Sequence, residues 1–494
     1  MQKLVTSEQI RNIESDLIKK SSSEGSLKLM EKAGFGLAEV IKKYNEPYLF
    51  ICGKRNNGGD GLVAARYLYD LGEKVQICLI SEESLLSPDS KTNLNLIKGK
   101  ISYTSVNEVN SKLFYEELNK ANTVIECLLG TGTNKKSNSL FEWIIKTVND
   151  SNKAVIACDI PIGVNPDTGS IQEYTIKAKT TVTFGYPKIG LALYPAKKYV
   201  GLLEVIDIGL PDVNTDSFLL DDQFLKENLP NRKADSNKGS FGKALLVCGS
   251  MKYPGAALLA GKAASSIGSG LTAMASPKEV FDQITKDIPE ITHVEFNEAK
   301  ILEESKNSSV IVIGPGLTNT DETKALVESL ITKVSIPIVL DADGINVLAG
   351  NKEIIKSVKN EIVLTPHPKE FAKLVGVSVE EVLNNKIDLV KDIVSKLGCN
   401  IVLKGPGTII CNKDKKIFIS PFANSALAKG GTGDVLAGFI GGLIAQGLKP
   451  DLAACVGVYI HGKSGELVAK DKTVFSLLPQ DLITYLPQVI KMYL

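Results

Sequence analysis

The residues best suited to chemistry lie near the C-terminus, in the run GGTGD at 430–434. Its glycines let the backbone approach a phosphate closely, and the apolar run at 435–443 predicts a helix whose free N–H groups point at that phosphate. Asp434 falls in the first turn of this helix, where a carboxylate can take a proton from an attacking hydroxyl. A helix N-terminus also favours an acidic residue without any chemistry. The density of glycine decides between the two, and we interpret the run as a phosphate- or nucleotide-binding turn.

Other motifs in the second half follow candidate strands. GPGL at 314–317 offers close backbone approach. Asp341 and Asp343 could hold Mg²⁺ indirectly or cap a helix, and the sequence leaves both readings open. His367 stands between two prolines at a strand end, where a rigid turn can present it to a ligand, although a lone histidine is more often structural. Lys404 precedes a glycine-rich turn and suits a phosphate or a nucleotide.

Three motifs in the first half also follow strands. NNGGDG at 56–61 opens a helix, LGTGT follows a later strand at 129–133, and Asp159 begins DIPIG at 159–163. In open α/β sheets, ligands bind in the crevice at the carboxyl ends of the strands. Each motif by itself fits a tight connection, but all three gather at one edge of the predicted sheet. We therefore expect a second polar ligand site there.

The elements that must position these residues are short apolar strands separated by amphipathic helices. Strands that are apolar throughout predict a mostly parallel sheet covered on both faces. The polar, proline-containing segment at about 212–240 interrupts this alternation of strands and helices, which predicts a linker. The expected strands are Tyr48–Cys52, Val75–Ile80, Thr123–Cys127, Ala154–Cys158, Thr180–Phe184, Leu203–Ile206, Ala244–Cys248, Val310–Ile313, Ile338–Leu340, Ile362–Leu364 and Ile401–Leu403; the expected helices include Gly61–Leu71, Val435–Gln446 and Leu452–Lys470.

Composition narrows the class of protein. The 494 residues are 44% hydrophobic and 23% charged, which is typical of a globular chain of two or three domains. A net charge of +1 gives no reason to expect nucleic acid or a membrane as partner. The N-terminus lacks a signal-peptide pattern, and no apolar run is long enough to span a bilayer. The eight scattered cysteines and three histidines argue against a disulfide framework or zinc site. We expect a cytoplasmic protein.

Taken together, the motifs resemble those of the bifunctional NAD(P)HX repair enzymes, along essentially the whole chain. In the first half the resemblance rests on NNGGDG (56–61), LLGTG (128–132) and DIP-x-G (159–163). In the second half it rests on KGSFG (238–242), GPGL (314–317), DADG (341–344), TPHPKE (365–370), KGPGT (404–408) and GGTGDVLAG (430–438). The order of the six C-terminal motifs makes that part of the match specific.

The resemblance implies an α/β protein of two domains. Residues 1–215 would form a Rossmann-like, three-layer α/β/α domain with NAD(P)HX epimerase activity. Residues 222–494 would form a ribokinase-like domain that dehydrates S-NAD(P)HX with ADP or ATP. The implied partners are NAD(P)HX and ADP or ATP, with Mg²⁺ accompanying the nucleotide and potassium in the epimerase half. We also expect a homo-oligomer.

Site residues follow from the same resemblance, position by position. The catalytic residues would be Asp434 in the dehydratase and Asp159 in the epimerase. The residues that bind NAD(P)HX in the epimerase would be Asn56, Asn57, Gly58, Gly59, Asp60, Gly130, Thr131, Gly132, Thr133, Asn134, Lys135, Lys136 and Asp159. Those that bind it in the dehydratase would be Ala256, Gly316, His367 and Asp434. The nucleotide would contact Lys404, Gly405, Pro406, Gly407, Thr408 and Gly433.

The first half departs from its family pattern at the potassium site. The positions that match the family's ligands are Asn57, Glu126 and Ile162, where the family has asparagine, aspartate and serine. The isoleucine side chain offers no oxygen. An alternative reading of the whole chain is a ribokinase-like small-molecule kinase with a catalytically degraded N-terminal binding module. Release of inorganic phosphate, as opposed to a stably phosphorylated alcohol, separates the two.

Overall fold

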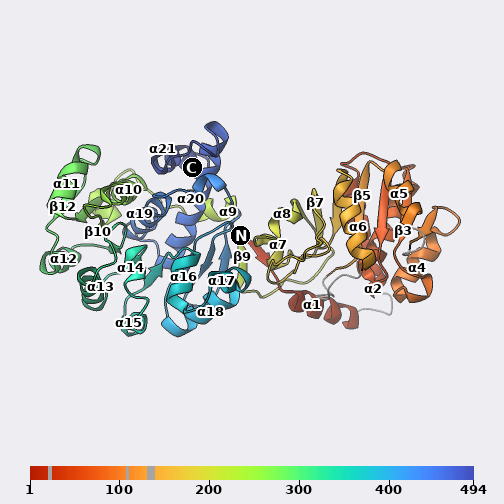
Figure 1. The fold of residues 1–494 in the computed structure, drawn as a ribbon, viewed down its shortest axis with the longest axis horizontal. Helices are drawn as coiled ribbons and strands as arrows, with labels where there is room; N and C mark the ends of the chain where they lie inside the picture. The colour runs from red at the N-terminus through yellow and green to blue at the C-terminus, as the bar shows by residue number, and fades with distance from the viewer. Residues whose placement is uncertain (21–24, 107–110, 131–138) are drawn as a thin grey trace. The chain divides into compact units, whose positions relative to one another are not determined.

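The structure, a computed structural model, describes residues 1–20, 25–106, 111–130 and 139–494 (Figure 1). The chain divides into two compact units, Lys3–Thr215 and Asp216–Leu494, and the second also takes in Met1–Gln2. The expected domains, 1–215 and 222–494, divide the chain near the same point. Within the described ranges, no helix combines the length and the apolar character that crossing a bilayer requires.

The N-terminal unit is built on a seven-stranded, wholly parallel sheet in the order β4-β3-β2-β5-β6-β7-β8. Its strands are β2 (Tyr48–Cys52), β3 (Val75–Leu79), β4 (Tyr103–Ser105), β5 (Thr123–Cys127), β6 (Ala154–Cys158), β7 (Thr180–Phe184) and β8 (Leu202–Ile206). Its helices are α1 (Ser7–Lys20), α2 (Gly25–Ile41), α3 (Asn56–Asp70), α4 (Pro88–Ile97), α5 (Ser111–Lys120), α6 (Ser139–Asp150), α7 (Ile189–Ala192) and α8 (Lys197–Val200).

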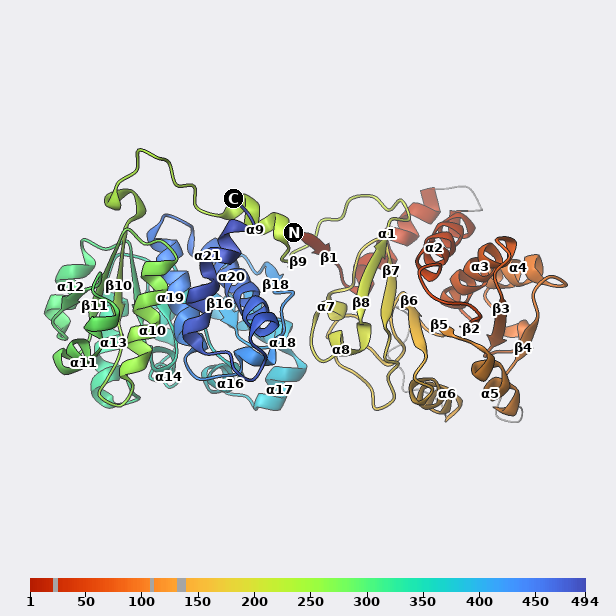
Figure 2. The ribbon, with the colours of Figure 1, turned by 90° about the horizontal axis from the view of Figure 1, so that it is seen from above.

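Helices cover both faces of this sheet, as the expected three layers require. Figure 2 shows α2, α3 and α4 on one side of the strands and α5 and α6 on the other. Successive residues of a strand point to opposite faces. Accordingly, Phe50 of β2 packs in the core beneath α2 and α3, whereas Ile51 packs in the core on the side of α6.

Helix α3 begins at Asn56, whereas the sequence predicted a helix only from Gly61. The glycines of NNGGDG therefore lie inside the helix and not in a preceding loop. They permit close packing: a Cβ on Gly58 would lie 1.9 Å from the carbonyl oxygen of Gly53. A Cβ on Gly61 would lie 2.7 Å from Sγ of Cys127. The motif thus holds the start of α3 directly against the ends of β2 and β5.

The C-terminal unit is built on a sheet whose own strands follow the order β9-β18-β17-β16-β15-β14-β13-β10-β11-β12. Along this order, the neighbours from β16 through β12 pair in parallel, and β17 is antiparallel to both of its neighbours. The strands are β9 (Ser217–Leu219), β10 (Lys243–Val247), β11 (Leu271–Ala275), β12 (Thr292–Val294), β13 (Val310–Ile313), β14 (Ile338–Leu340), β15 (Ile362–Leu364), β16 (Asn400–Leu403), β17 (Ile409–Cys411) and β18 (Ile417–Ile419).

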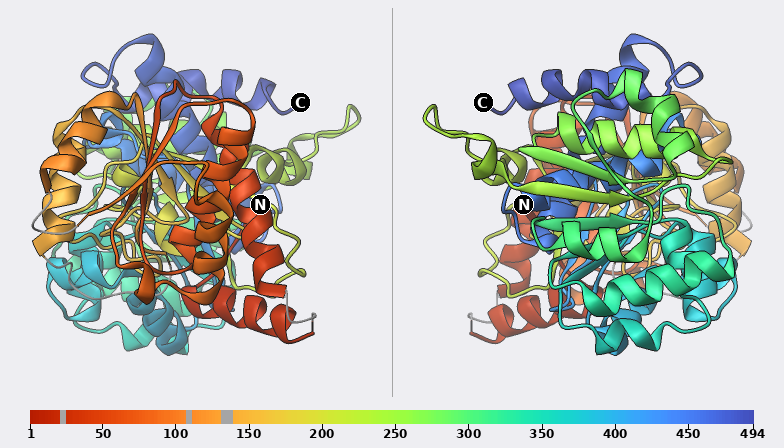
Figure 3. Two further views of the ribbon diagram at one scale, coloured as in Figure 1. Left: turned by 90° about the vertical axis from the view of Figure 1, so that its right-hand side faces the viewer. Right: turned by 90° about the vertical axis from the view of Figure 1, so that its left-hand side faces the viewer.

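Helices flank this sheet on both sides as well, which Figure 3 shows in its right-hand view. One face carries the main core, which contains Leu246 and Val312 together with residues of the helices α10, α19, α20 and α21. The helices are α9 (Asp222–Asn228), α10 (Pro254–Ser266), α11 (Lys278–Ile284), α12 (Glu298–Ser305), α13 (Asp321–Lys333), α14 (Asp343–Asn346), α15 (Glu353–Ser357), α16 (Pro368–Val375), α17 (Val379–Asn384), α18 (Lys386–Leu397), α19 (Thr432–Ala445), α20 (Pro450–Asp471) and α21 (Pro479–Lys491).

The segment at 212–240, predicted as a linker, contains a strand and a helix between irregular stretches. Strand β9 pairs in parallel with β18, and α9 follows it. Phe224 and Leu225 of α9 are buried in the main core of the C-terminal unit. The sequence did not predict this helix, because polar and proline residues surround its apolar positions. The prediction of a linker over the whole segment is therefore wrong.

Candidate active sites

The N-terminus of α19 forms one wall of a cavity in the C-terminal unit. The helix starts at Thr432 after Gly431, which has a φ of 97° and so lies in the left-handed region that favours glycine. The cavity has a volume of about 520 Å³. Its lining consists of Lys252, Tyr253, Pro254, Gly255, Ala256, Leu259, Gly316, Asp343, Gly430, Gly431 and Asp434. Three of the four residues predicted to bind the hydrated cofactor, Ala256, Gly316 and Asp434, therefore meet in one cavity.

Asp434 is a carboxyl group of this cavity whose ionisation is strongly perturbed. Burial raises its pKa to about 7, and the negative charges of Asp341, Asp343 and Glu370 add to the rise. The positive charge of Lys404 opposes it. A group with a pKa near the working pH is suited to accept a proton during a reaction. The arrangement therefore places a carboxyl group suited to that role at the start of a helix.

Lys404 lies between Asp341 and the start of α19. Its Nζ donates to Oδ1 of Asp341 at 2.6 Å, and the same oxygen accepts from Oγ1 of Thr365 at 2.7 Å. Burial by itself lowers the pKa of Lys404, but Asp341 and Glu370 outweigh that effect and raise it. A Cβ placed on Gly433 would be 3.2 Å from this ammonium. A permanent positive charge thus stands beside the free N–H groups of α19, as an anion site requires.

The remaining predicted nucleotide residues form the turn between β16 and β17. Oγ1 of Thr408 donates to the carbonyl oxygen of Gly405 at 3.0 Å and closes this turn. Gly405 and Pro406 are exposed, Gly407 is buried, and no atom lies within 4 Å of a Cβ built on Gly405. The turn therefore continues from Lys404 into open space, where a large ligand has room.

His367 and the acidic pair of DADG have structural partners. Nδ1 of His367 accepts from the backbone N–H groups of Lys369 and Glu370 and so caps α16. Its pKa is lowered by burial and by the nearby Lys404, and it is not among the residues that line the cavity. Asp343 begins α14, lines the cavity, and accepts from the N–H of Thr318 at 2.8 Å. A contact between His367 and a ligand stays a prediction.

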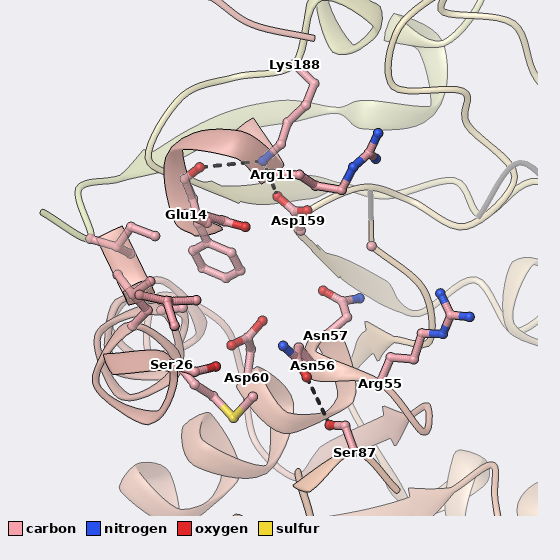
Figure 4. Close-up of a pocket in the computed structure, with 17 residues that line it drawn as sticks. Arg11, Glu14, Ser26, Arg55, Asn56, Asn57, Asp60, Ser87, Asp159 and Lys188 are labelled. Carbon is pink, nitrogen blue, oxygen red and sulfur yellow. Dashed lines mark hydrogen bonds and ion pairs between the residues drawn. The ribbon is translucent and has the colours of Figure 1, made fainter. Parts of the chain in front are cut away.

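The N-terminal unit has its own pocket, of about 390 Å³, at the carboxyl ends of its strands (Figure 4). Of the residues predicted for the epimerase, Asn56, Asn57, Asp60, Gly130 and Asp159 line it. Gly58 and Gly59 lie inside α3 and are buried. The other predicted residues, Thr131, Gly132, Thr133, Asn134, Lys135 and Lys136, lie outside the described residues.

Asp159 follows β6 and is held by a lysine that the sequence did not single out. Its φ is 64°, in the left-handed region, which is uncommon for a residue with a side chain. Oδ1 of Asp159 accepts from Nζ of Lys188 at 2.5 Å and from Oγ1 of Thr183 at 3.0 Å. Lys188 is 2% exposed. Lys188 also lines the pocket, although no local motif marks it, because it follows Asp159 by 29 residues and approaches it only through the fold.

The residues predicted for potassium do not build a cation site. Glu126 is fully buried, and its two carboxylate oxygens accept from the N–H groups of Leu128 at 2.8 Å and Ile162 at 3.0 Å. Burial raises its pKa to about 7. The side chain of Ile162 packs in the hydrophobic core. Of the three, Asn57 alone lines the pocket, so these side chains do not supply the converging oxygens that a potassium ion needs.

Family models match both units of this α/β fold. The model described as NAD(P)H-hydrate dehydratase matches residues 244–488, and the one described as YjeF-related protein N-terminus matches residues 26–190. Among solved structures, the ADP/ATP-dependent NAD(P)H-hydrate dehydratase of Bacillus subtilis, co-crystallised with ATP and Mg²⁺, is 32% identical with a TM-score of 0.51. The match covers 99% of that structure's chain and 56% of this chain. The C-terminal unit is thus a ribokinase-like domain of the dehydratase class.

Relatives of full length carry both units. The bifunctional NAD(P)H-hydrate repair enzyme of Moorella thermoacetica is 34% identical, with 94% of this chain and 92% of the relative covered. That of Coxiella burnetii is 33% identical, with 98% of both chains covered. The protein belongs to the family of bifunctional NAD(P)H-hydrate repair enzymes.

Proposed function

We propose that the protein repairs hydrated nicotinamide cofactors in two steps. The N-terminal unit interconverts the R and S epimers of NAD(P)HX. The C-terminal unit dehydrates the S epimer to NAD(P)H, with ADP or ATP as phosphoryl donor. The observation that carries this proposal is Asp434 at the N-terminus of α19, a carboxyl group with a pKa near 7 in a cavity beside Lys404. Family membership supports both activities.

The chemistry proposed for the dehydratase begins with the ring hydroxyl. Asp434 takes its proton, and the oxygen attacks the terminal phosphorus of the nucleotide while AMP or ADP leaves. The N–H groups at the start of α19 and the Lys404 ammonium stabilise the negative charge that develops. The lone pair of the ring nitrogen then expels phosphate, and loss of a proton from the neighbouring ring carbon restores the double bond. Phosphate leaves more readily than hydroxide, which is the purpose of the phosphoryl transfer.

The carboxylate of Asp343 suits the Mg²⁺ that accompanies the nucleotide, because it is an oxygen ligand at the cavity wall. Asp341 is already bonded to Lys404 and Thr365 and positions the lysine. We assign no step to potassium, since Glu126 and Ile162 do not fit it.

The test is to supply mixed NADHX epimers, with and without ADP or ATP, and to follow both NADH and inorganic phosphate. Equal amounts of NADH and phosphate are expected. A stably phosphorylated product without NADH would mean that the C-terminal unit is a kinase. Asp434→Asn should lower the rate by about 10²–10⁴-fold. Asp321→Asn is the matched control, because Asp321 lies in the first turn of α13 and outside the cavity.

A further inference from the structure

Of the three carboxyl groups that line the pocket of the N-terminal unit, those of Asp60 and Asp159 lie in different surroundings. We propose that Asp60 and Asp159 form the acid–base pair of epimerisation, in which one gives a proton to the departing ring hydroxyl and the other takes a proton from the entering water, with Lys188 as the positioning residue of Asp159. Both carboxyl groups and Lys188 line the same pocket. The inference rests on the proposed epimerase function and names the groups that carry it out.

Asp159 is placed to accept a proton. Its Oδ1 is occupied by the ammonium of Lys188 and the hydroxyl of Thr183. Its Oδ2 faces Gly130, since a Cβ built on that glycine would lie 3.4 Å from it. Among the described residues, Oδ2 has no hydrogen-bond donor. A carboxylate with one oxygen fixed by an ion pair and the other directed toward a pocket can receive a proton there.

Asp60 is placed to donate a proton. It lies on α3, on a different wall of the pocket from Asp159 (Figure 4). No hydrogen bond or ion pair to its carboxyl group occurs among the described residues. Burial raises its pKa well above the ordinary value, and the charges of Asp159 and Glu14 raise it further, against Lys188. A carboxyl group kept neutral in this way is able to act as a general acid.

Epimerisation by this pair exchanges the hydroxyl at the ring carbon bonded to the ring nitrogen. The bond from that carbon to the hydroxyl oxygen breaks, the electron pair stays on the oxygen, and the proton of Asp60 completes a water molecule. The nitrogen lone pair forms a double bond to the same carbon. Water then adds from the other face and gives its proton to Asp159, and the double-bond electrons return to nitrogen. Proton exchange with solvent then returns the proton to Asp60 and removes it from Asp159. In the reverse direction Asp159 is the acid and Asp60 is the base.

Other charged groups face this pair and bear on its pH dependence. Glu14 and Arg11 come from α1 and line the pocket. Burial raises the pKa of Glu14, Lys188 and Arg11 lower it, and Asp159 raises it. Arg55 lines the pocket from the residue before α3. Glu14 is therefore the group that competes with Asp60 for the role of acid, and it has to be substituted in parallel.

The first experiment measures interconversion of a single purified NADHX epimer by chromatography, without nucleotide, after subtraction of the uncatalysed rate. Asp60→Asn and Asp159→Asn should each lower kcat by about 10²–10⁴-fold. Asp70→Asn, at the exposed end of the same helix α3, should leave the rate unchanged. A rate for Asp60→Asn within threefold of the parent, or a loss on Glu14→Gln as large as that expected for Asp60→Asn, overturns the assignment of Asp60.

The second experiment tests Lys188 by a pH profile. Loss of a neighbouring positive charge disfavours the ionised carboxylate. Lys188→Met should therefore move the acidic limb of the epimerisation profile to higher pH, and Lys188→Arg should restore most of it. An unmoved acidic limb in a folded Lys188→Met protein contradicts the positioning role. Because Lys188 is buried, folding is checked by the fluorescence of Trp143, and Thr183→Val provides a milder perturbation of the same oxygen.

The third experiment follows the oxygen atom in H₂¹⁸O. Each epimerisation should introduce one solvent oxygen into the product, since the hydroxyl leaves as water. Product that keeps its original oxygen would show that the ring opens and recloses, and would overturn the proposed acid–base exchange. Absence of any catalysed epimerisation by the parent protein would instead refute the proposed function of the N-terminal unit. The two failures are thus distinguishable.

Discussion

Replacement of Asp434 by asparagine is expected to lower activity and raise stability together. The carboxyl group has a pKa of about 7, chiefly because burial disfavours its ionised form. The folded protein therefore holds a proton at pH values where the unfolded chain, with an ordinary pKa of 3.8, has already lost it. Between these two values the free energy of unfolding falls as the pH rises. Asparagine carries no ionisable group, so this loss is absent in the variant.

The size of the effect follows from the shift. The pKa of Asp434 is raised by about three units, and each unit corresponds to about 1.4 kcal/mol. The variant can therefore gain at most about 4 kcal/mol in free energy of unfolding over the parent above pH 7. Part of the side chain reaches solvent, which reduces the cost of ionising it in the folded protein. We therefore expect the variant to be about 2 kcal/mol more stable than the parent at pH 8. Below about pH 3 both states hold the proton, and this stability difference between variant and parent should then disappear. The rate of dehydration should fall in the variant by about 10²–10⁴-fold at pH 7–8, where the parent carboxyl group is ionised enough to act as a base.

Calorimetry from pH 5 to 8 measures this difference. The chain has one tryptophan, Trp143, which lies in the N-terminal unit. Fluorescence therefore identifies the unfolding of that unit, and the remaining calorimetric transition belongs to the C-terminal unit. The stability of parent and Asp434→Asn should diverge as the pH rises toward 8. If the two curves run parallel over this range, burial does not govern the pKa of Asp434 and the reasoning is refuted.

Three further outcomes are expected. Glu126→Gln should destabilise the N-terminal unit by about 1–3 kcal/mol in urea denaturation followed by Trp143 fluorescence, because one buried N–H loses its acceptor oxygen; an unchanged midpoint would contradict this. Epimerisation should show no saturable activation by potassium, and Ile162→Ser should not create it, since this side chain lies in the core. A fragment of residues 216–494 should fold and dehydrate the S epimer, and an inactive fragment from an active parent would show that the units depend on each other.

The regular part of the fold could be predicted because buried parallel strands are apolar along their whole length. Val310–Ile313 and Ile338–Leu340 have the predicted bounds for this reason. Strand β11 was missed because its residues, LTAMA, include two alanines, which have little preference for strands. Strands β17 and β18 were missed because their antiparallel pairing depends on the chain reversing at 412–416.

The sites were predictable where one local motif carries the chemistry. Asp434 lies in the first turn of α19, as the GGTGD run indicated. Lys188 could not be identified, because its role depends on a contact with Asp159 that forms only in the folded sheet. The same holds for Glu126, whose contact with the N–H of Ile162 joins two separate strand ends. A family pattern predicted a cation there, and the larger side chain makes backbone hydrogen bonds instead.

The position of Asp434 sets two physical effects against each other. A helix N-terminus favours a carboxylate, typically by 0.3–1 kcal/mol, or about half a pKa unit in the downward direction. Burial and the nearby acidic residues raise the pKa by about three units, so they exceed the helix effect severalfold. The helix dipole therefore does not hold the pKa of Asp434 in its ordinary range. A base whose pKa is near 7 can take the hydroxyl proton at neutral pH and later release it, which the carboxylate of an ordinary surface aspartate does poorly.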